Sequence, residues 1–109
     1  MTKVTINPGV CGFVTTVEAI GQGEDNQDVK LVVHSGCEPV MNMFTELGDT
    51  FDSFELCLVR PGKGPLYEYA AEKFPPHCAC PVPAGITKAA EAECRLALPR
   101  DSWIKFDAE

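Results

Sequence analysis

The chain has 109 residues, a length that supports one domain with one hydrophobic core and is too short for two. Hydrophobic residues make up 45% and charged residues 23%, which is typical of a folded globular protein and argues against disorder. The formal net charge is −7 and no stretch clusters lysine with arginine, so binding to nucleic acids or to anionic membranes is not expected.

The first residues and the hydropathy of the chain predict a cytoplasmic protein. Residues 1–9 lack the apolar run of a secretory signal peptide, and no stretch approaches the roughly 20 apolar residues of a membrane span. The six cysteines are therefore expected to stay reduced. Reduced cysteines in this number point to metal ligands or reactive thiols.

The first third of the chain predicts three β-strands. Residues 3–6 alternate between apolar and polar side chains, residues 13–20 are rich in β-branched residues, and residues 29–34 form a third such run. Turns at residues 7–9 and 21–28 join them. Because the connections are short, an antiparallel three-stranded meander is the simplest arrangement.

The remaining two thirds predict mostly helices. Residues 39–47, 66–74 and 84–97 carry apolar side chains at helical spacing, and glycine or proline follows each segment. The sequence thus predicts an α+β fold in a single domain, residues 1–109, with the meander packed against three or four helices. Residues 102–106 are expected to form a last strand or an ordered tail.

Residues 50–59 fit two structures. Apolar side chains alternate there as in a strand, yet Phe51, Phe54 and Leu58 also form one stripe of a helix. Thr50 in the N-cap position favours a short helix.

Four cysteines lie in loops that the predicted topology brings together. In an up-down-up meander, the loop after the first strand shares one edge of the sheet with the end of the third, so Cys11 and Cys37 meet there. Cys78 and Cys80 form a Cys-x-Cys unit before the last helix. Cys37 and this unit both stand at helix N-termini, which favour negative charge. Four thiolates suit tetrahedral zinc or an iron–sulfur centre. Four unrelated small apolar side chains are the alternative.

The other cysteines and the histidines have different expected roles. Cys57 and Cys94 continue apolar helical stripes and are expected to pack in the core. His77 is adjacent to Cys78, and its imidazole is a further candidate metal ligand. His34 ends the third strand and is expected to face water.

The cysteine-bearing segments resemble a known family. Cys11-Gly12 after a strand, Gly36-Cys37 opening a helix, and Pro75-Pro76-His77-Cys78 before a long final helix are similar to the IscU/NifU-type iron–sulfur scaffold domain over residues 3–97. Cys80-Pro81 is similar to the final Cys-Pro of the TSCPD domain. Residues 98–109 lie beyond the resemblance.

The resemblance implies an IscU/SufE-like fold of three antiparallel strands and several helices. It implies that Cys11, Cys37 and one of Cys78 or Cys80 hold zinc or a nascent iron–sulfur cluster. It also suggests a cysteine desulfurase or an iron–sulfur client protein as partner.

Two residues depart from the scaffold pattern. Phe13 stands where the scaffold family has an aspartate that is tied to cluster release, and Cys80 is an additional thiol. Replacing a carboxylate by a thiolate makes the donor set softer, so a more stably held centre is expected. The segment 74–76 echoes only part of the family's chaperone-docking motif, so chaperone binding is not expected.

Three functions remain as alternatives. The main hypothesis is a non-enzymatic metal-binding protein in which Cys11, Cys37, Cys78 and Cys80 ligate an iron–sulfur cluster or zinc. The second is a SufE-like sulfur-transfer protein in which Cys37 or Cys78 carries a persulfide. The third is an interaction module whose zinc only braces the fold.

Overall fold

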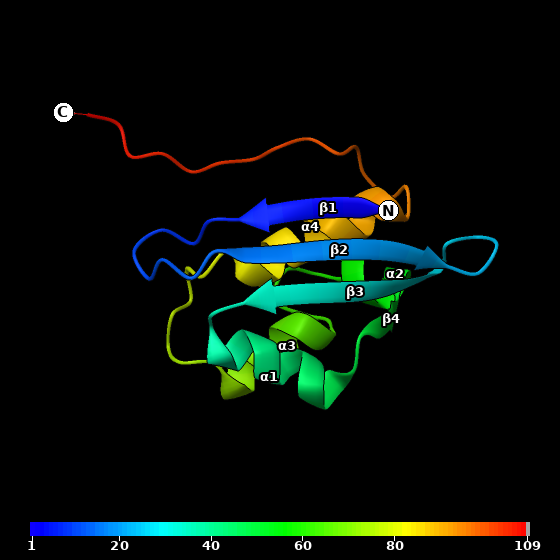
Figure 1. Cartoon of the computed structure of the whole chain (residues 1–109), viewed down its shortest axis with the longest axis horizontal. Helices are drawn as coiled ribbons and strands as arrows, with labels where there is room; N and C mark the ends of the chain where they lie inside the picture. The colour runs from blue at the N-terminus through cyan, green and yellow to red at the C-terminus, as the bar shows by residue number, and fades with distance from the viewer. Residues whose placement is uncertain (109) are drawn as a thin grey trace.

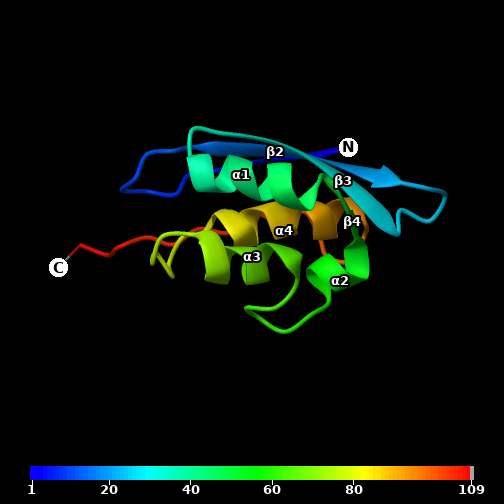
Figure 2. The same ribbon diagram turned by 90° about the horizontal axis from the view of Figure 1, so that it is seen from below.

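One antiparallel sheet and four helices make up the computed structural model, which describes residues 1–108 (Figures 1 and 2). The α+β fold predicted from the sequence is therefore confirmed. Of the helices, α4 packs against β1 and β2, and α1 packs against β3. In chain order, the elements are β1 (Thr2–Ile6), β2 (Thr15–Gln22), β3 (Asp28–Ser35), α1 (Glu38–Leu47), β4 (Thr50–Asp52), α2 (Ser53–Cys57), α3 (Pro65–Lys73) and α4 (Val82–Glu93).

The strands follow one another across the sheet in the order β1-β2-β3-β4, each antiparallel to its neighbour. The predicted three-stranded meander is present, and β4 adds a short fourth strand beside β3. Val17 lies opposite Val4 on one side and Val33 on the other. Such cross-strand pairs of β-branched residues stabilise a sheet and set its register.

The segment after α1 differs from the prediction. The predicted short helix is present as α2, but its N-cap is Asp52 and not Thr50, because Thr50 begins the short strand β4. The Asp52 carboxylate accepts hydrogen bonds from the backbone N–H groups of Phe54 and Glu55 at 2.9 and 3.1 Å. Phe54 and Leu58 are exposed, so the predicted apolar stripe does not face the core. A short polar cap thus decides the local structure more than the apolar spacing does.

The last helix ends four residues earlier than predicted. Arg95 adopts a left-handed conformation with φ of 61°, its N–H donates to the carbonyl of Ala92, and the N–H of Leu96 donates to that of Glu91. This is the Schellman pattern that closes helices, and glycine usually occupies the left-handed position. Because position 95 is not a glycine, the sequence does not signal this end and predicts a helix that continues to residue 97.

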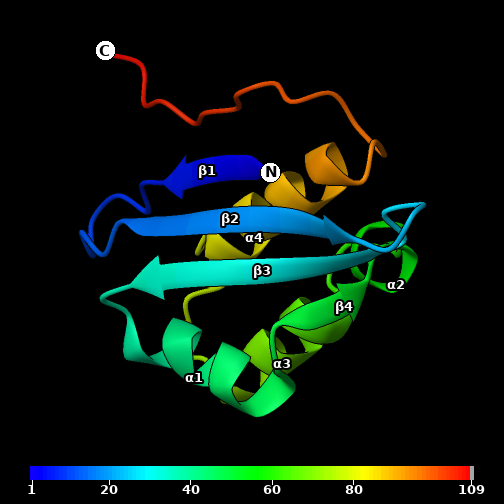
Figure 3. The ribbon, with the colours of Figure 1, turned by 45° about the vertical axis from the view of Figure 1, so that its right-hand side comes forward.

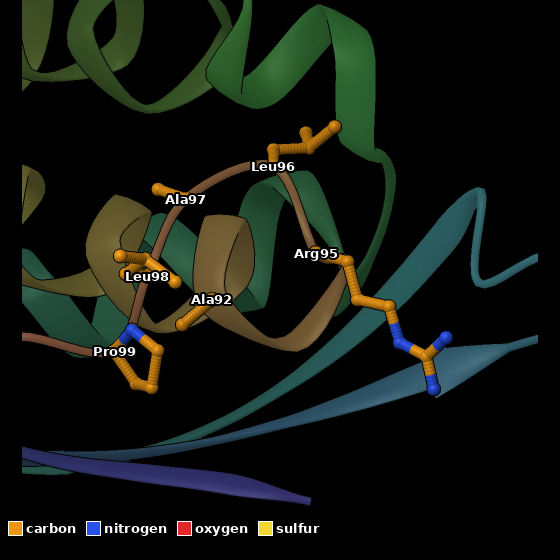
Figure 4. Close-up of a pocket in the computed structure, with 6 residues that line it drawn as sticks. All are labelled: Ala92, Arg95, Leu96, Ala97, Leu98 and Pro99. Carbon is orange, nitrogen blue, oxygen red and sulfur yellow. The ribbon is translucent and has the colours of Figure 1, made fainter.

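Residues 94–99 then turn the chain back along α4. Figure 4 shows Leu98 and Pro99 beside Ala92, around a hollow of about 330 Å³, while the side chain of Arg95 points away from them. Beyond Pro99 the tail is extended, and of the two alternatives predicted for residues 102–106, a last strand or an ordered tail, the strand does not form within the described residues.

The core lies between the sheet and α4 and is mainly aliphatic. Cys94 is buried in it and Cys57 packs against it, as predicted for both thiols. At the centre, Gly85 of α4 approaches β1 so closely that a Cβ atom at this position would overlap the side chain of Ile6. The fully enclosed aliphatic side chains include Val17, Val29, Val40, Leu31, Leu66 and Ile86.

No helix within residues 1–108 is both long enough and apolar enough to cross a membrane.

Candidate functional site

Three segments that are distant in the sequence lie at the same end of the molecule. Figures 1 and 2 show the loop 7–14 between β1 and β2, the start of α1 after β3, and the loop 74–81 between α3 and α4 at this end. The antiparallel order of β1, β2 and β3 explains why the loop 7–14 and the start of α1 lie at the same end, since β1 and β3 both end there. These segments carry the four cysteines singled out from the sequence, and we call this region the loop end.

The first two segments are in direct contact. A Cβ atom built on Gly36 would lie 3.0 Å from the Phe13 ring, so this ring packs closely over the glycine. Gly36 precedes Cys37, and Phe13 lies two residues after Cys11. The packing therefore ties the loop that carries Cys11 to the turn that carries Cys37.

Cys37 is half-buried at the N-cap of α1. Its backbone N–H donates a 3.1 Å hydrogen bond to the hydroxyl of Ser35, which also accepts a 2.7 Å hydrogen bond from the hydroxyl of buried Thr15. The two hydroxyl groups bridge β2 and β3 where the sheet ends. They hold the backbone of Cys37 against the last residues of both strands.

The segment before α4 forms a tight turn. The backbone N–H of Cys80 donates to the carbonyl of His77 at 3.1 Å, and Pro81 then occupies the N-cap of α4. Cys78 is exposed, whereas Cys80 is half-buried and packs against the core. The two thiols of the Cys-x-Cys unit thus differ in accessibility, which the sequence spacing does not indicate.

A groove of about 490 Å³ runs between α3 and this turn. Its residues include three candidates from the sequence, His77, Cys78 and Cys80. It also includes Tyr67, whose pKa is raised by burial and, to a smaller extent, by Cys80. The sequence reasoning missed Tyr67 because it lies off the apolar stripe of α3. The full lining is Gly62, Tyr67, Ala70, Ala71, Phe74, Pro75, Pro76, His77, Cys78, Cys80 and Pro83.

The chemistry of the donor set fits a soft metal, but a finished metal site is not assembled. All six cysteines are free of disulfides. Among residues 1–108, however, no three cysteine, histidine or acidic side chains form a group that could hold a metal ion. The loop end therefore gathers the cysteine-bearing segments without forming a closed coordination sphere.

The remaining candidates lie away from the loop end or in water. Cys57 is near α4, where its Sγ lies 3.9 Å from the carbonyl oxygen of Thr87. Burial, with contributions from Glu91 and Cys94, raises the pKa of the Cys57 thiol to about 12. Burial also raises the pKa of Cys94. His34 is exposed at the end of β3, as expected. The thiols of Cys57 and Cys94 are therefore structural.

Comparison with known proteins places the chain in a family. Residues 2–106 match the family described as "Family of unknown function (DUF6951)", and the chain belongs to this family. No curated protein and no solved structure matches it.

Proposed function

Starting from membership in a family without an assigned function, we propose that this chain is a cysteine-ligated metal-binding protein. Cys11, Cys37, Cys78 and Cys80 would hold an iron–sulfur cluster or zinc. The observation that carries the proposal is the gathering of the three cysteine-bearing segments at the loop end, with all four thiols free. The resemblance of these segments to iron–sulfur scaffolds points to the same residues.

Ligation requires the thiols to approach one another. Zinc–sulfur bonds are about 2.3 Å long and tetrahedral, so four ligating sulfurs lie within about 4 Å of each other. Since no three donors are so arranged within the described residues, the loops 7–14 and 74–81 must close on Cys37. Cys11 and Cys78, the exposed members, lie in these loops. Gly9 and Gly12 have φ values of 92° and 72°, which gives the first loop a backbone that adjusts readily.

Two further candidates belong to the same proposal. His77 shares the groove with Cys78 and Cys80, and its imidazole is a candidate replacement for one thiolate. A cysteine desulfurase or an iron–sulfur client protein is the partner that this chemistry suggests. Because the six thiols are free, we also propose a reducing compartment, the cytoplasm.

The test is anaerobic purification followed by analysis of iron, sulfide and zinc, together with the absorption spectrum. We expect bound metal, or its recovery by reconstitution. Each of the substitutions Cys11→Ser, Cys37→Ser, Cys78→Ser and Cys80→Ser should lower the metal content. The matched control is Cys57→Ala, which removes a thiol distant from the loop end and should leave the metal content unchanged. A chain that stays metal-free and resists reconstitution would contradict the proposal.

A second candidate function is sulfur transfer, which the groove beside α3 favours. An exposed thiol next to an apolar groove can accept sulfur from a protein persulfide. In that step the Cys78 thiolate attacks the terminal sulfur of the donor, the donor sulfur–sulfur bond breaks, and the donor leaves as a thiolate. Incubation with a cysteine desulfurase and cysteine, followed by mass spectrometry of the intact chain, tests it. Absence of added sulfur on the wild-type chain would exclude this function.

The third hypothesis, zinc as a structural brace, gains no support. The core of the domain is a continuous set of mainly aliphatic side chains from the sheet and the four helices, and Cys37 and Cys80 only pack against it, whereas Cys11 and Cys78 do not. A domain braced by zinc unfolds when the metal is removed. We expect this chain to keep its melting temperature within a few degrees after treatment with a chelator, as measured by circular dichroism.

A further inference from the structure

The C-terminal tail, residues 98–108, exposes large apolar side chains. Trp103, Ile104 and Phe106 have exposed fractions of 72%, 90% and 101%. Figures 1 and 3 show the tail as an extended segment that runs past β1, and Figure 2 shows it level with the helices rather than in the layer of the sheet. Within the described part of the chain, its one hydrogen bond joins the N–H of Arg100 to the carbonyl of Leu98. The family match extends to residue 106, so the tail is a regular part of this family's domain.

The tail has the pattern of a half-buried strand. In an extended chain, Ile104 and Phe106 fall on one side, while Trp103, Lys105 and Asp107 fall on the other. Alternation of this kind is typical of a strand with one face against a core and the other toward water. The tail therefore has the side chains of a sheet strand but lacks a partner strand among the described residues.

The free edge of β1 offers a matching partner. Among residues 1–108, β1 pairs with β2 on one side only, so the backbone groups on its other edge have no partner strand there. Val4 and Ile6 point toward the core, and Lys3 and Thr5 are exposed. A strand added to this edge would place Ile104 and Phe106 beside Val4 and Ile6, and so extend the apolar face of the sheet.

The direction of the tail favours a second copy over the tail of the same molecule. Figures 1 and 3 show that the tail runs in the same direction as its own β1. Pairing within one molecule would thus be parallel, whereas every strand pair in this sheet is antiparallel. In a dimer with a two-fold axis, the tail of each copy can pair antiparallel with β1 of the other copy.

The area available suits a weak, reversible dimer. A packed phenylalanine buries about 150–250 Å², so Phe106 from two tails contributes about 300–500 Å². The receiving surfaces lose a similar area, and Ile104 adds to both. A total on the order of 1,000 Å² lies at the low end of specific interfaces between proteins, which is why we expect a dimer that depends on concentration.

We propose that the tail of one copy adds to the β1 edge of a second copy as an antiparallel strand, reciprocally, to form a two-fold dimer. The proposal does not depend on metal binding, because the tail and β1 carry none of the candidate ligands.

The test uses the full chain in sedimentation velocity over a range of concentrations. We expect a concentration-dependent dimer, and the double substitution Ile104→Asp with Phe106→Asp should weaken its dissociation constant by at least about tenfold. The matched control is Val59→Asp, which places the same charge on an exposed apolar position after α2 and should leave the dimer intact. Hydrogen exchange should show added protection of β1 amides in the dimer.

Three outcomes would overturn the proposal. One is a monomer at every concentration. Another is a dimer that the double substitution in the tail does not weaken. The third is protection of the free edge of β1 in a monomer, which would mean that the tail pairs within its own molecule.

Discussion

The carboxylate of Glu93, in the last turn of α4, accepts a 2.9 Å hydrogen bond from the backbone N–H of Gly21 in β2. It also accepts a 2.8 Å hydrogen bond from the hydroxyl of Thr2 in β1. One acidic side chain thus joins the helix to two strands. Burial alone would raise the pKa of Glu93, but the hydrogen bonds from Gly21 and Thr2 act in the opposite direction, and the pKa is lowered.

Glu93 should make the stability of the domain depend on pH. A carboxyl group whose pKa is lower in the folded state stabilises the fold above its ordinary value of 4.5, and this contribution is lost as the pH falls. We expect Glu93→Gln to reduce the free energy of unfolding at pH 7 by about 1–3 kcal/mol and to flatten its loss below pH 5. Urea denaturation at several pH values measures both effects. Glu91→Gln is the control, since Glu91 makes only a weak 4.0 Å contact with Lys88. Equal pH profiles for wild type and Glu93→Gln would contradict the prediction.

Arg95→Gly should stabilise the protein. Arg95 holds the left-handed position of the Schellman motif, which costs a non-glycine residue about 1–2 kcal/mol. Glycine removes this strain but loses more entropy on folding, so we expect a net gain of about 0.5–1 kcal/mol in chemical denaturation. Arg95→Ala keeps the strain and should give no gain. A gain of the same size for alanine would show that loss of the arginine side chain is the cause.

Phe13→Asp should make a bound metal centre more labile. The ring of Phe13 packs over Gly36, the residue before Cys37, whereas an aspartate would add a hard donor and open the contact. After reconstitution, we expect faster loss of metal to a chelator, followed by absorption, with the fold retained by circular dichroism. Phe13→Leu keeps an apolar side chain over the glycine and should release the metal more slowly than Phe13→Asp. If Phe13→Asp released the metal at the wild-type rate, Phe13 would have no influence on the stability of the metal centre.

Cys57 should react slowly with alkylating reagents. Its pKa of about 12 leaves very little thiolate at pH 8, and its side chain packs against the core. We expect iodoacetamide to modify the exposed Cys11 and Cys78 first, with Cys57 and Cys94 modified only after unfolding. Peptide mass spectrometry at timed intervals resolves the order. Early labelling of Cys57 in the native protein would disagree with its packed position.

Gly85→Ala should destabilise the domain. The added methyl group overlaps the Ile6 side chain, and overpacking of this kind costs about 1–3 kcal/mol. Ile6→Ala removes the Cγ1 and Cδ1 atoms that cause the overlap, so the double variant should lose less stability than the sum of the two single variants. Thermal and urea denaturation of the four proteins gives this coupling. Simple additivity would mean that the cost of Gly85→Ala does not arise from the overlap with Ile6.

The sequence predicted the class of fold because its strongest signals are periodic. Alternation in β1 to β3 and helical spacing in α1 depend on burial of one face, which the structure confirms for Val17, Leu31 and Val40. The predicted helix boundaries are wrong where a single residue determines the start or the end of a helix. Asp52 caps α2 through its side chain, and Arg95 ends α4 in a conformation for which glycine is the usual signal. Neither effect leaves a periodic pattern.

The candidate site was predictable in part. Antiparallel topology is sufficient to bring the segments of Cys11 and Cys37 to one end, because it depends only on short turns. The distance between the four sulfurs is not predictable in this way, since it depends on the conformation of two loops. The groove beside Tyr67 was also missed, because it arises from the packing of α3 against a turn that begins with two prolines.

The unequal burial of the four loop-end thiols has a consequence for the order in which ligands would be recruited. Cys37 and Cys80 pack against the core and are held beside the N-termini of α1 and α4, while Cys11 and Cys78 are exposed. The two packed sulfurs are restrained more than the two exposed ones. Binding of a metal to them would cost the chain little conformational entropy, and the larger cost would come from ordering the two exposed side chains that bind later. We therefore expect assembly in two kinetic phases, with the slower phase abolished by Cys11→Ser.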